Sequence, residues 1–254
     1  MQNIGIILYT QGNNEKNLSK SLSSLLELSD RVLVVCDGEL PRLGILKDFK
    51  SVEFKKVNYY AGCVNHGIRH FLNTDVDHIF VVNDNVIILD KKVFKDFINV
   101  NEQTNLDLMV SNGMKDKNRL YIDLKDDYQL DLVSEFDGYV IYFNTNTVKK
   151  VGFFDERYKT TFELLDYYKR SADTGVTTPF GWFATISNVK DNIFNQENKP
   201  NIKHRVYTSD SIEDRIISGM KLFKLKYKAM VNDLTNIFSK SDVVKKLKLL
   251  VSRK

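Results

Sequence analysis

The sequence is short of the residues and runs that identify several classes of protein. Its 254 residues include two cysteines, Cys36 and Cys63, and three prolines. So few cysteines fit a reducing compartment and argue against a disulfide framework. No segment approaches the roughly 18 consecutive apolar residues of a membrane-spanning helix. The first nine residues have neither a basic start nor a cleavage site, so they predict a strand rather than a signal peptide. Together these absences predict a cytoplasmic protein.

Several cofactor-binding motifs are also missing. No Gly-x-x-x-x-Gly-Lys-Ser/Thr segment is present, which argues against a P-loop enzyme. No Gly-x-Gly-x-x-Gly segment follows the first predicted strand, which argues against a dinucleotide oxidoreductase. His66, His70 and His78 have no ligand spacing with either cysteine, so a zinc site is not expected.

What the sequence does contain is an alternation of strand patterns and helical patterns. Hydrophobic residues make up 43% of the chain, enough for a core in one large or two small domains. Compact apolar runs predict strands, and apolar residues at helical spacing predict helices. The predicted strands are 4–9, 31–36, 52–57, 79–82, 106–111, 120–124 and 139–143, and the predicted helices are 15–28, 65–72, 148–151 and 162–171. This order predicts an α/β fold with a mostly parallel central sheet flanked by helices.

Positive charge is concentrated near the C-terminal end. Residues 220–254 hold ten basic and two acidic side chains, so this segment carries +8 and the rest of the chain −4. Apolar residues there, Phe223 and Tyr227 among them, recur on one helical face. We therefore predict a body, residues 1–211, and a basic amphipathic helical tail, residues 212–254. The tail suits an anionic membrane surface, nucleic-acid phosphates, or packing against the body or a second subunit, and these alternatives stay open.

Polar residues stand where three of the predicted strands end. Thr10 follows the first strand, Asp37 ends the second, and the triplet Asn83-Asp84-Asn85 follows the strand at 79–82. In an open α/β sheet, ligands bind outside the carboxyl ends of the strands. Oxygen atoms at this edge could hold a phosphate-bound metal or a sugar hydroxyl. The alternative for Asp37 is that Asp37-Gly38 only ends a strand, because both residue types favour turns.

Six segments occur in an order that is typical of one enzyme family. They are Ile6-Ile7-Leu8-Tyr9-Thr10-Gln11-Gly12-Asn13, Val34-Val35-Cys36-Asp37-Gly38-Glu39, Gly62-Cys63-Val64-Asn65-His66-Gly67-Ile68, Asp77-His78-Ile79-Phe80-Val81-Val82-Asn83-Asp84-Asn85-Val86, Val151-Gly152-Phe153-Phe154-Asp155-Glu156-Arg157-Tyr158 and Phe162-Glu163-Leu164-Leu165-Asp166-Tyr167. Over roughly residues 3–185 the chain thereby resembles a family 2-type glycosyltransferase of the GT-A fold. The resemblance implies a Rossmann-like GT-A domain that transfers a sugar from a nucleotide-sugar to an acceptor hydroxyl with inversion.

The same resemblance implies roles for particular residues. The donor would be bound by Thr10, Asp37, Asn65, Asn83, Asp84 and Asn85. A divalent cation, Mn²⁺ or Mg²⁺, would be held by Asp84 and Asn85, with His204 nearby. Glu163 is the first candidate for the catalytic base and Asp166 the second, and Trp182 is the candidate for stacking on an acceptor sugar. The acceptor would be a glycan or a lipid-linked glycan, which with the basic tail suggests a peripheral position at the inner membrane face.

The chain also departs from the family pattern in three of the six segments. Cys36 replaces one carboxylate beside Asp37, Asn83 and Asn85 are amides where the family has an Asp-x-Asp motif, and Leu164 follows Glu163 in place of Asp. An amide oxygen brings no charge to a hard-cation site. These departures motivate a second hypothesis, a GT-A-like binding or scaffold subunit that has lost catalysis. A third hypothesis is a sugar transferase that modifies DNA bases, with the basic tail on the phosphates.

Overall fold

The computed structural model describes much of the predicted body and a short segment of the tail. The described residues are 3–12, 15–38, 49, 52–88, 92–111, 119–123, 129–133, 140–159, 162–178, 183–186, 194–196, 221–223 and 225–227. Within these ranges, no helix is both long enough and apolar enough to cross a membrane.

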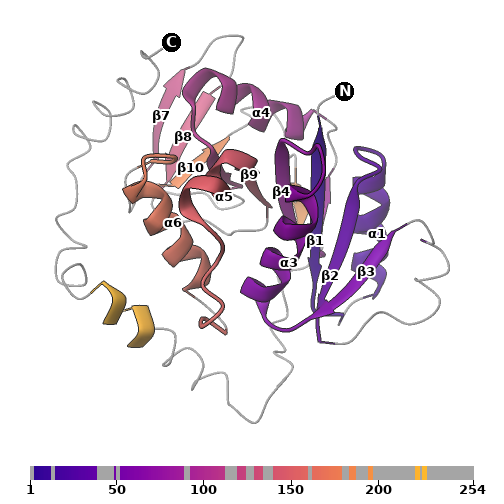
Figure 1. Cartoon of the computed structure of the whole chain (residues 1–254). Helices are drawn as coiled ribbons and strands as arrows, with labels where there is room; N and C mark the ends of the chain where they lie inside the picture. The colour runs from indigo at the N-terminus through magenta and orange to yellow at the C-terminus, as the bar shows by residue number, and fades with distance from the viewer. Residues whose placement is uncertain are drawn as a thin grey trace.

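Most of the strands belong to one mixed sheet. The strands are β1 (Ile4–Thr10), β2 (Val32–Asp37), β3 (Glu53–Val57), β4 (His78–Asn83), β5 (Val86–Ile88), β6 (Leu108–Val110), β7 (Arg119–Asp123), β8 (Gln129–Val133), β9 (Val140–Asn144), β10 (Phe183–Ile186) and β11 (Phe194–Gln196). Among the described residues, the main sheet has nine strands in the order β3-β2-β1-β4-β9-β6-β10-β8-β7 (Figure 1). β3, β2, β1 and β4 run parallel, and β9 lies antiparallel between β4 and β6. β5 and β11 form a separate antiparallel pair.

Helices cover both faces of the main sheet. They are α1 (Glu15–Leu26), α3 (Tyr60–Leu72), α4 (Val93–Thr104), α5 (Thr145–Val151) and α6 (Glu163–Asp173). α1 and α4 pack on one face, where Leu22 and Phe97 join the core beside Phe80. α3, α5 and α6 pack on the other face, where Ile68 and Tyr167 join a second core cluster, and they lie together in front of the sheet in Figure 1. We call these the α1 face and the α3 face.

Alternation along the central strands decides which side chain meets which face. In β1, Ile6 and Leu8 enter the core of the α1 face, whereas Ile7 enters that of the α3 face. β2 is buried at every position, Val32–Asp37. A strand covered on both faces is apolar throughout, which is why the sequence here shows a continuous run rather than an alternating one.

The α/β class with a parallel N-terminal half is confirmed, but several boundaries differ from the predictions. The helix predicted at 65–72 begins at Tyr60, and the single turn predicted at 148–151 is the longer α5. The helix α4 and the strands β5, β8, β10 and β11 were not predicted. Of the predicted tail helix, 221–223 and 225–226 are helical, and its other residues lie outside the described ranges.

Two glycines of α3 give a matched test of how tightly this helix packs on the sheet. A Cβ atom on Gly67 would lie 2.6 Å from Ile7 Cδ1, whereas one on Gly62 would lie 3.3 Å from Val57 Cγ1. We expect Gly67→Ala to lower the free energy of unfolding by about 1–3 kcal/mol, because overpacking of the buried Ile7 exceeds the gain in helix propensity. Gly62→Ala should change it by less than about 1 kcal/mol. Urea unfolding of both variants checks this, and equal stability of the two would contradict it.

Candidate functional site

The predicted strand-end residues meet at one edge of the sheet, divided between its two faces. β1 lies between β2 and β4, with Thr10 opposite Cys36 and Tyr9 opposite Asn83. The alternation of core residues therefore places Tyr9, Asp37 and Asn83 on the α3 face. Thr10 and Asp84 lie with Cys36 on the α1 face.

Asp37 is held in place by two neighbouring tyrosines. The hydroxyl of Tyr9 donates to Asp37 Oδ2 at 3.2 Å, and the backbone N–H of Tyr59 donates to Asp37 Oδ1 at 2.8 Å. Tyr59, the residue before α3, has φ 62°, a left-handed value that is strained for a bulky side chain. The contact with Asp37 helps to hold that conformation, so the end of β2 and the start of α3 fix each other.

Tyr60 links this carboxylate to the start of α6. Its ring meets the Tyr9 ring edge to face, with 4.9 Å between the centroids. Burial, and secondarily the nearby charge of Glu163, raise the pKa of Tyr60 well above its usual value. Glu163, the first residue of α6, is half-buried. The structure therefore brings Asp37, Tyr9, Tyr60 and Glu163 together on the α3 face from four different elements.

On the α1 face, Thr10 and Asp84 form a second polar pair. The Thr10 hydroxyl donates to the Asp84 carboxylate, and the Gly12 N–H donates to Thr10 Oγ1 at 2.9 Å. The Asp84 N–H donates to the Tyr9 carbonyl at 3.0 Å. Burial raises the pKa of Asp84 to about 6, against the lowering effect of its hydrogen bonds. Asp84 therefore joins the end of β4 to the loop after β1.

Asn65, on α3, connects this helix by hydrogen bonds to the chain segment after α5. Its Nδ2 donates to the Phe154 carbonyl at 3.0 Å and to Glu156 Oε1 at 2.7 Å, and its Oδ1 accepts from the Phe154 N–H at 2.8 Å. The side chain is 1% exposed. Its amide thus joins α3 to residues 154–156, and its contact with a donor stays a prediction.

Asp166 is enclosed by cations and hydroxyls. Its side chain is 0% exposed, and Arg170 Nε donates to Oδ2 at 2.9 Å. Lys226 Nζ lies 2.7 Å from Oδ1, and the Tyr227 hydroxyl donates to the same oxygen at 2.8 Å. A carboxylate engaged in this way has no access to an acceptor hydroxyl. The geometry therefore gives Asp166 a structural position and leaves the half-buried Glu163 as the remaining candidate for the base.

The candidate cation ligands at the end of β4 are amide oxygens. Asn83 Oδ1 and Asn85 Oδ1 are buried and, among the described residues, accept no hydrogen bond. Buried acceptors normally have a partner, so these atoms fit a cation or a donor hydroxyl. The described part of the chain holds no group of three or more His, Cys, Asp or Glu suited to a metal. Asn83 and Asn85 thus fit a cation that gets its other ligands from a bound diphosphate. The carboxylate of Asp84, which was predicted as a cation ligand, accepts a hydrogen bond from Thr10.

Two predicted site residues lie outside the described ranges. Trp182, the candidate for acceptor stacking, and His204, the candidate near the metal, are not among the described residues. Both stay predictions.

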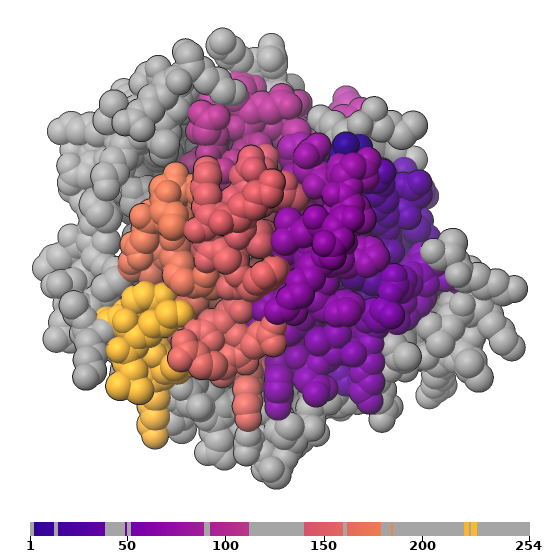
Figure 2. All heavy atoms as spheres, viewed as in Figure 1, coloured from indigo at the N-terminus to yellow at the C-terminus, as the bar shows by residue number. Residues whose placement is uncertain are grey.

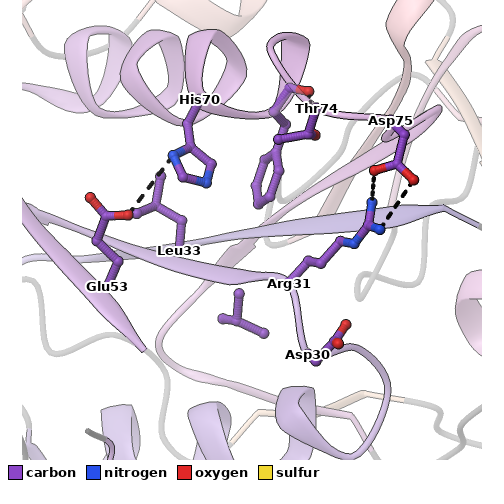
Figure 3. A pocket seen from close by; sticks show the side chains of 9 residues that line it. Asp30, Arg31, Leu33, Glu53, His70, Thr74 and Asp75 are labelled. Atoms are coloured by element: carbon purple, nitrogen blue, oxygen red, sulfur yellow. Dashed lines mark hydrogen bonds and ion pairs between the residues drawn. The ribbon is translucent and has the colours of Figure 1, made fainter. Parts of the chain in front are cut away.

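A separate hollow lies at the opposite, amino edge of the sheet. Arg31, before β2, makes a two-pronged ion pair with Asp75, at 2.5 and 3.2 Å, and His70 faces Glu53 at 3.9 Å (Figure 3). Arg31 is thus occupied by Asp75, and ligands of such sheets bind at the other edge. This hollow is therefore not part of the candidate site.

Sequence reasoning missed Tyr9, Tyr59 and Tyr60 as site residues. The two-residue period of β1 shows that Tyr9 and Thr10 point to opposite faces, but only the register with β2 puts Tyr9 on the face of Asp37. The Tyr59-Tyr60 pair precedes a helix that faces this edge. Its left-handed backbone depends on the tertiary contact with Asp37, which no local pattern shows.

The raised pKa of Asp84 predicts a pH-dependent stability for the metal-free chain. Because the folded pKa of about 6 lies above the ordinary value of 3.8, the folded state binds this proton more tightly. The contribution of Asp84 to stability is full below pH 4 and is lost as the pH rises through 6. Asp84→Asn, which can still accept from Thr10, should be more stable than the wild type by about 2–3 kcal/mol at pH 7.5, and much less so at pH 4. Urea unfolding in EDTA at the two pH values checks this, and a variant equally destabilised at both would contradict it.

Comparisons with known proteins identify the fold. No family model matches the chain, and no curated protein matches it by sequence. The crystal structure of S. aureus TarS 1–349 in complex with UDP-GlcNAc matches all of this chain (100%) and 72% of that chain, with a TM-score of 0.57 and 14% identity. The crystal structure of S. aureus TarS also matches 100% of this chain, with a TM-score of 0.54 and 13% identity. The chain spans only 43% of that longer protein. At these identities the likeness concerns the fold alone, and this chain has a GT-A-like α/β fold.

Proposed function

We propose that this chain is a glycosyltransferase that moves a sugar from a nucleotide-sugar to an acceptor hydroxyl with inversion. The observation that carries the proposal is the meeting of Asp37, Tyr9, Tyr60 and Glu163 on one face of the carboxyl edge. The fold match supports a nucleotide-sugar as the proposed donor, because TarS 1–349 was crystallised in complex with UDP-GlcNAc.

Asp37 is the proposed recognition group for the nucleoside. Its carboxylate is fixed by Tyr9 and by the Tyr59 N–H, and it is 8% exposed. An ionised carboxylate accepts hydrogen bonds only, so its natural partners on a donor are a nucleobase imide or a ribose hydroxyl. Preorganisation by the two tyrosines removes part of the entropy cost of binding.

Glu163 is the proposed general base. In the transfer step the acceptor hydroxyl gives its proton to Glu163, and the acceptor oxygen bonds to the anomeric carbon from the face opposite the diphosphate. The bond from the anomeric carbon to the phosphate oxygen breaks, and the nucleoside diphosphate leaves with the electron pair. Attack on the opposite face inverts the anomeric configuration. The half-buried position of Glu163 at the start of α6, on the Asp37 side of the sheet, suits this role.

Asn83 and Asn85 are the proposed protein ligands of a divalent cation, Mn²⁺ or Mg²⁺. A bound cation supplies charge neutralisation for the leaving diphosphate. Since the two amide oxygens bring no charge, we expect the cation to bind together with the nucleotide and weakly without it. The acceptor, which we propose to be a glycan or lipid-linked glycan, would approach from the Glu163 side.

One specific observation favours a binding subunit as the second candidate. Leu164 stands beside Glu163, and Asn83 and Asn85 replace charged ligands, so three carboxylate positions of the resembled family are neutral here. A chain of this kind would bind a nucleotide-sugar at Asp37 without turning it over. Turnover therefore separates the two candidates.

Glu163→Gln tests the proposed base directly. We expect it to lower kcat for sugar transfer or donor hydrolysis by about 10²–10⁴-fold, because the amide cannot accept the proton, with little change in donor binding. Glu102→Gln on the exposed side of α4 is the matched control and should keep full activity. The assay uses a panel of UDP- and GDP-sugars with and without Mn²⁺. The thermal shift produced by each nucleoside diphosphate is measured in parallel.

Two outcomes of this assay would contradict parts of the proposal. Activity in the wild type that survives Glu163→Gln would reject the base assignment. Nucleotide binding without turnover of any donor would favour the binding subunit.

A further inference from the structure

A short C-terminal segment is bound to the start of α6. We call residues 221–223 and 225–227 the C-terminal clamp. Lys226 Nζ lies 2.7 Å from Asp166 Oδ1 and 3.1 Å from Asp155 Oδ2, so one ammonium bridges α6 and the chain segment after α5. Figure 2 shows the clamp as yellow spheres against the salmon and orange spheres of those segments. The partners of Lys226, Asp155 and Asp166, therefore come much earlier in the sequence, on either side of Glu163.

The clamp also has an apolar side. Phe223 is 5% exposed and joins a small core with Tyr158, against which Phe162 packs. The rings of Phe223 and Phe162 are 5.6 Å apart, and those of Phe223 and Tyr227 are 4.8 Å apart. Apolar contact and ion pairing therefore act together on one short stretch of chain.

The residue that the clamp covers is strained and immediately precedes the proposed base. Phe162 has φ 63° and ψ −14°, the left-handed region, at the position that caps α6. A bulky non-glycine residue adopts this conformation only where its surroundings enforce it. The Asp166 N–H donates to the Phe162 carbonyl at 2.8 Å, which closes the first turn of α6 around Glu163. The backbone on both sides of Glu163 is thus held by residues that the clamp contacts.

Charge makes the clamp more than a packing contact. Asp166 is 0% exposed, and a buried carboxylate is stable only with cations or donors around it. Arg170 supplies one cation, and it also donates to the Val151 and Phe153 carbonyls at 2.8 and 2.9 Å. Lys226 supplies the other, and Tyr227 adds a hydroxyl. Without Lys226, Oδ1 of Asp166 has no cation beside it, and the first turn of α6 loses its ionic link to Asp155.

We propose that the C-terminal clamp is a positioning element that sets the place of Glu163 through Asp166 and Phe162. The inference rests on the proposed function, because it concerns the base of that reaction. Lys226 and Tyr227 are positioning residues and touch no reacting atom. The clamp thus couples a segment of the basic tail to catalysis, and Lys226 is directed inward to Asp166 and Asp155.

Lys226→Met tests the clamp, with Lys221→Met as the matched control, because Lys221 is an exposed lysine of the same segment. We expect Lys226→Met to lower kcat at least tenfold while the donor KM stays within twofold, and Lys226→Arg to restore most of kcat. Tyr227→Phe removes a single hydroxyl and should lower kcat by a smaller factor, which keeps the test valid if Lys226→Met fails to fold. Lys221→Met should match the wild type.

Backbone hydrogen exchange gives a readout that needs no activity. The amide of Asp166 should exchange at least tenfold faster in Lys226→Met than in the wild type or Lys221→Met. Equal exchange and equal kcat in the two methionine variants would overturn the clamp. If Asp166 exchanges faster in Lys226→Met but the wild type neither binds nor turns over any donor, the structural role of the clamp is supported. The proposed function is then overturned.

Discussion

The parallel register of β1 between β2 and β4 is the constraint on which the site depends. It brings the ends of three strands to one edge, and the two-residue period then sorts their side chains between two faces. Tyr9, Asp37 and Asn83 are on the α3 face because Ile7 and Val81 are in the core there. A slip of one residue would reverse every assignment, and the buried apolar residues on both faces are what prevents it.

The three aspartates of this region are stabilised in different ways. Asp37 is held by hydrogen bonds from Tyr9 and the Tyr59 N–H, which are neutral donors suited to a binding group. Asp84 is bonded to Thr10 in a buried place that favours its protonated form. Asp166 is ionically paired with Arg170 and Lys226. Asp84 lies on the α1 face, whereas Asp37 and Asp166 lie on the α3 face with Glu163, and of these two it is Asp166 that is enclosed by cations.

The sequence predicted the central strands because their signals are local. The apolar runs at β1, β2 and β4 and the polar residues that end them were found at the right places, and the predicted start of α6, Phe162, lies one residue before the observed start. It did not predict α4, although Phe94, Phe97 and Ile98 recur there at helical spacing as the apolar residues of α1 do. It also did not separate Asp166 from Glu163, because the partner that encloses Asp166, Lys226, is sixty residues further along the chain. Contacts of that range are set by tertiary packing rather than by spacing on a helix.

The most direct test of the central claim is where a nucleotide binds. Addition of UDP or UDP-GlcNAc with Mn²⁺ to the ¹⁵N-labelled chain should shift the backbone amide signals of Asp37, Tyr60 and Glu163 together, with one common dissociation constant. The signals of Arg31 and His70, at the hollow on the amino edge, should stay in place. Shifts confined to the amino edge, or shifts at Asp37 that leave Glu163 unmoved, would contradict a single donor site at the carboxyl edge of the sheet.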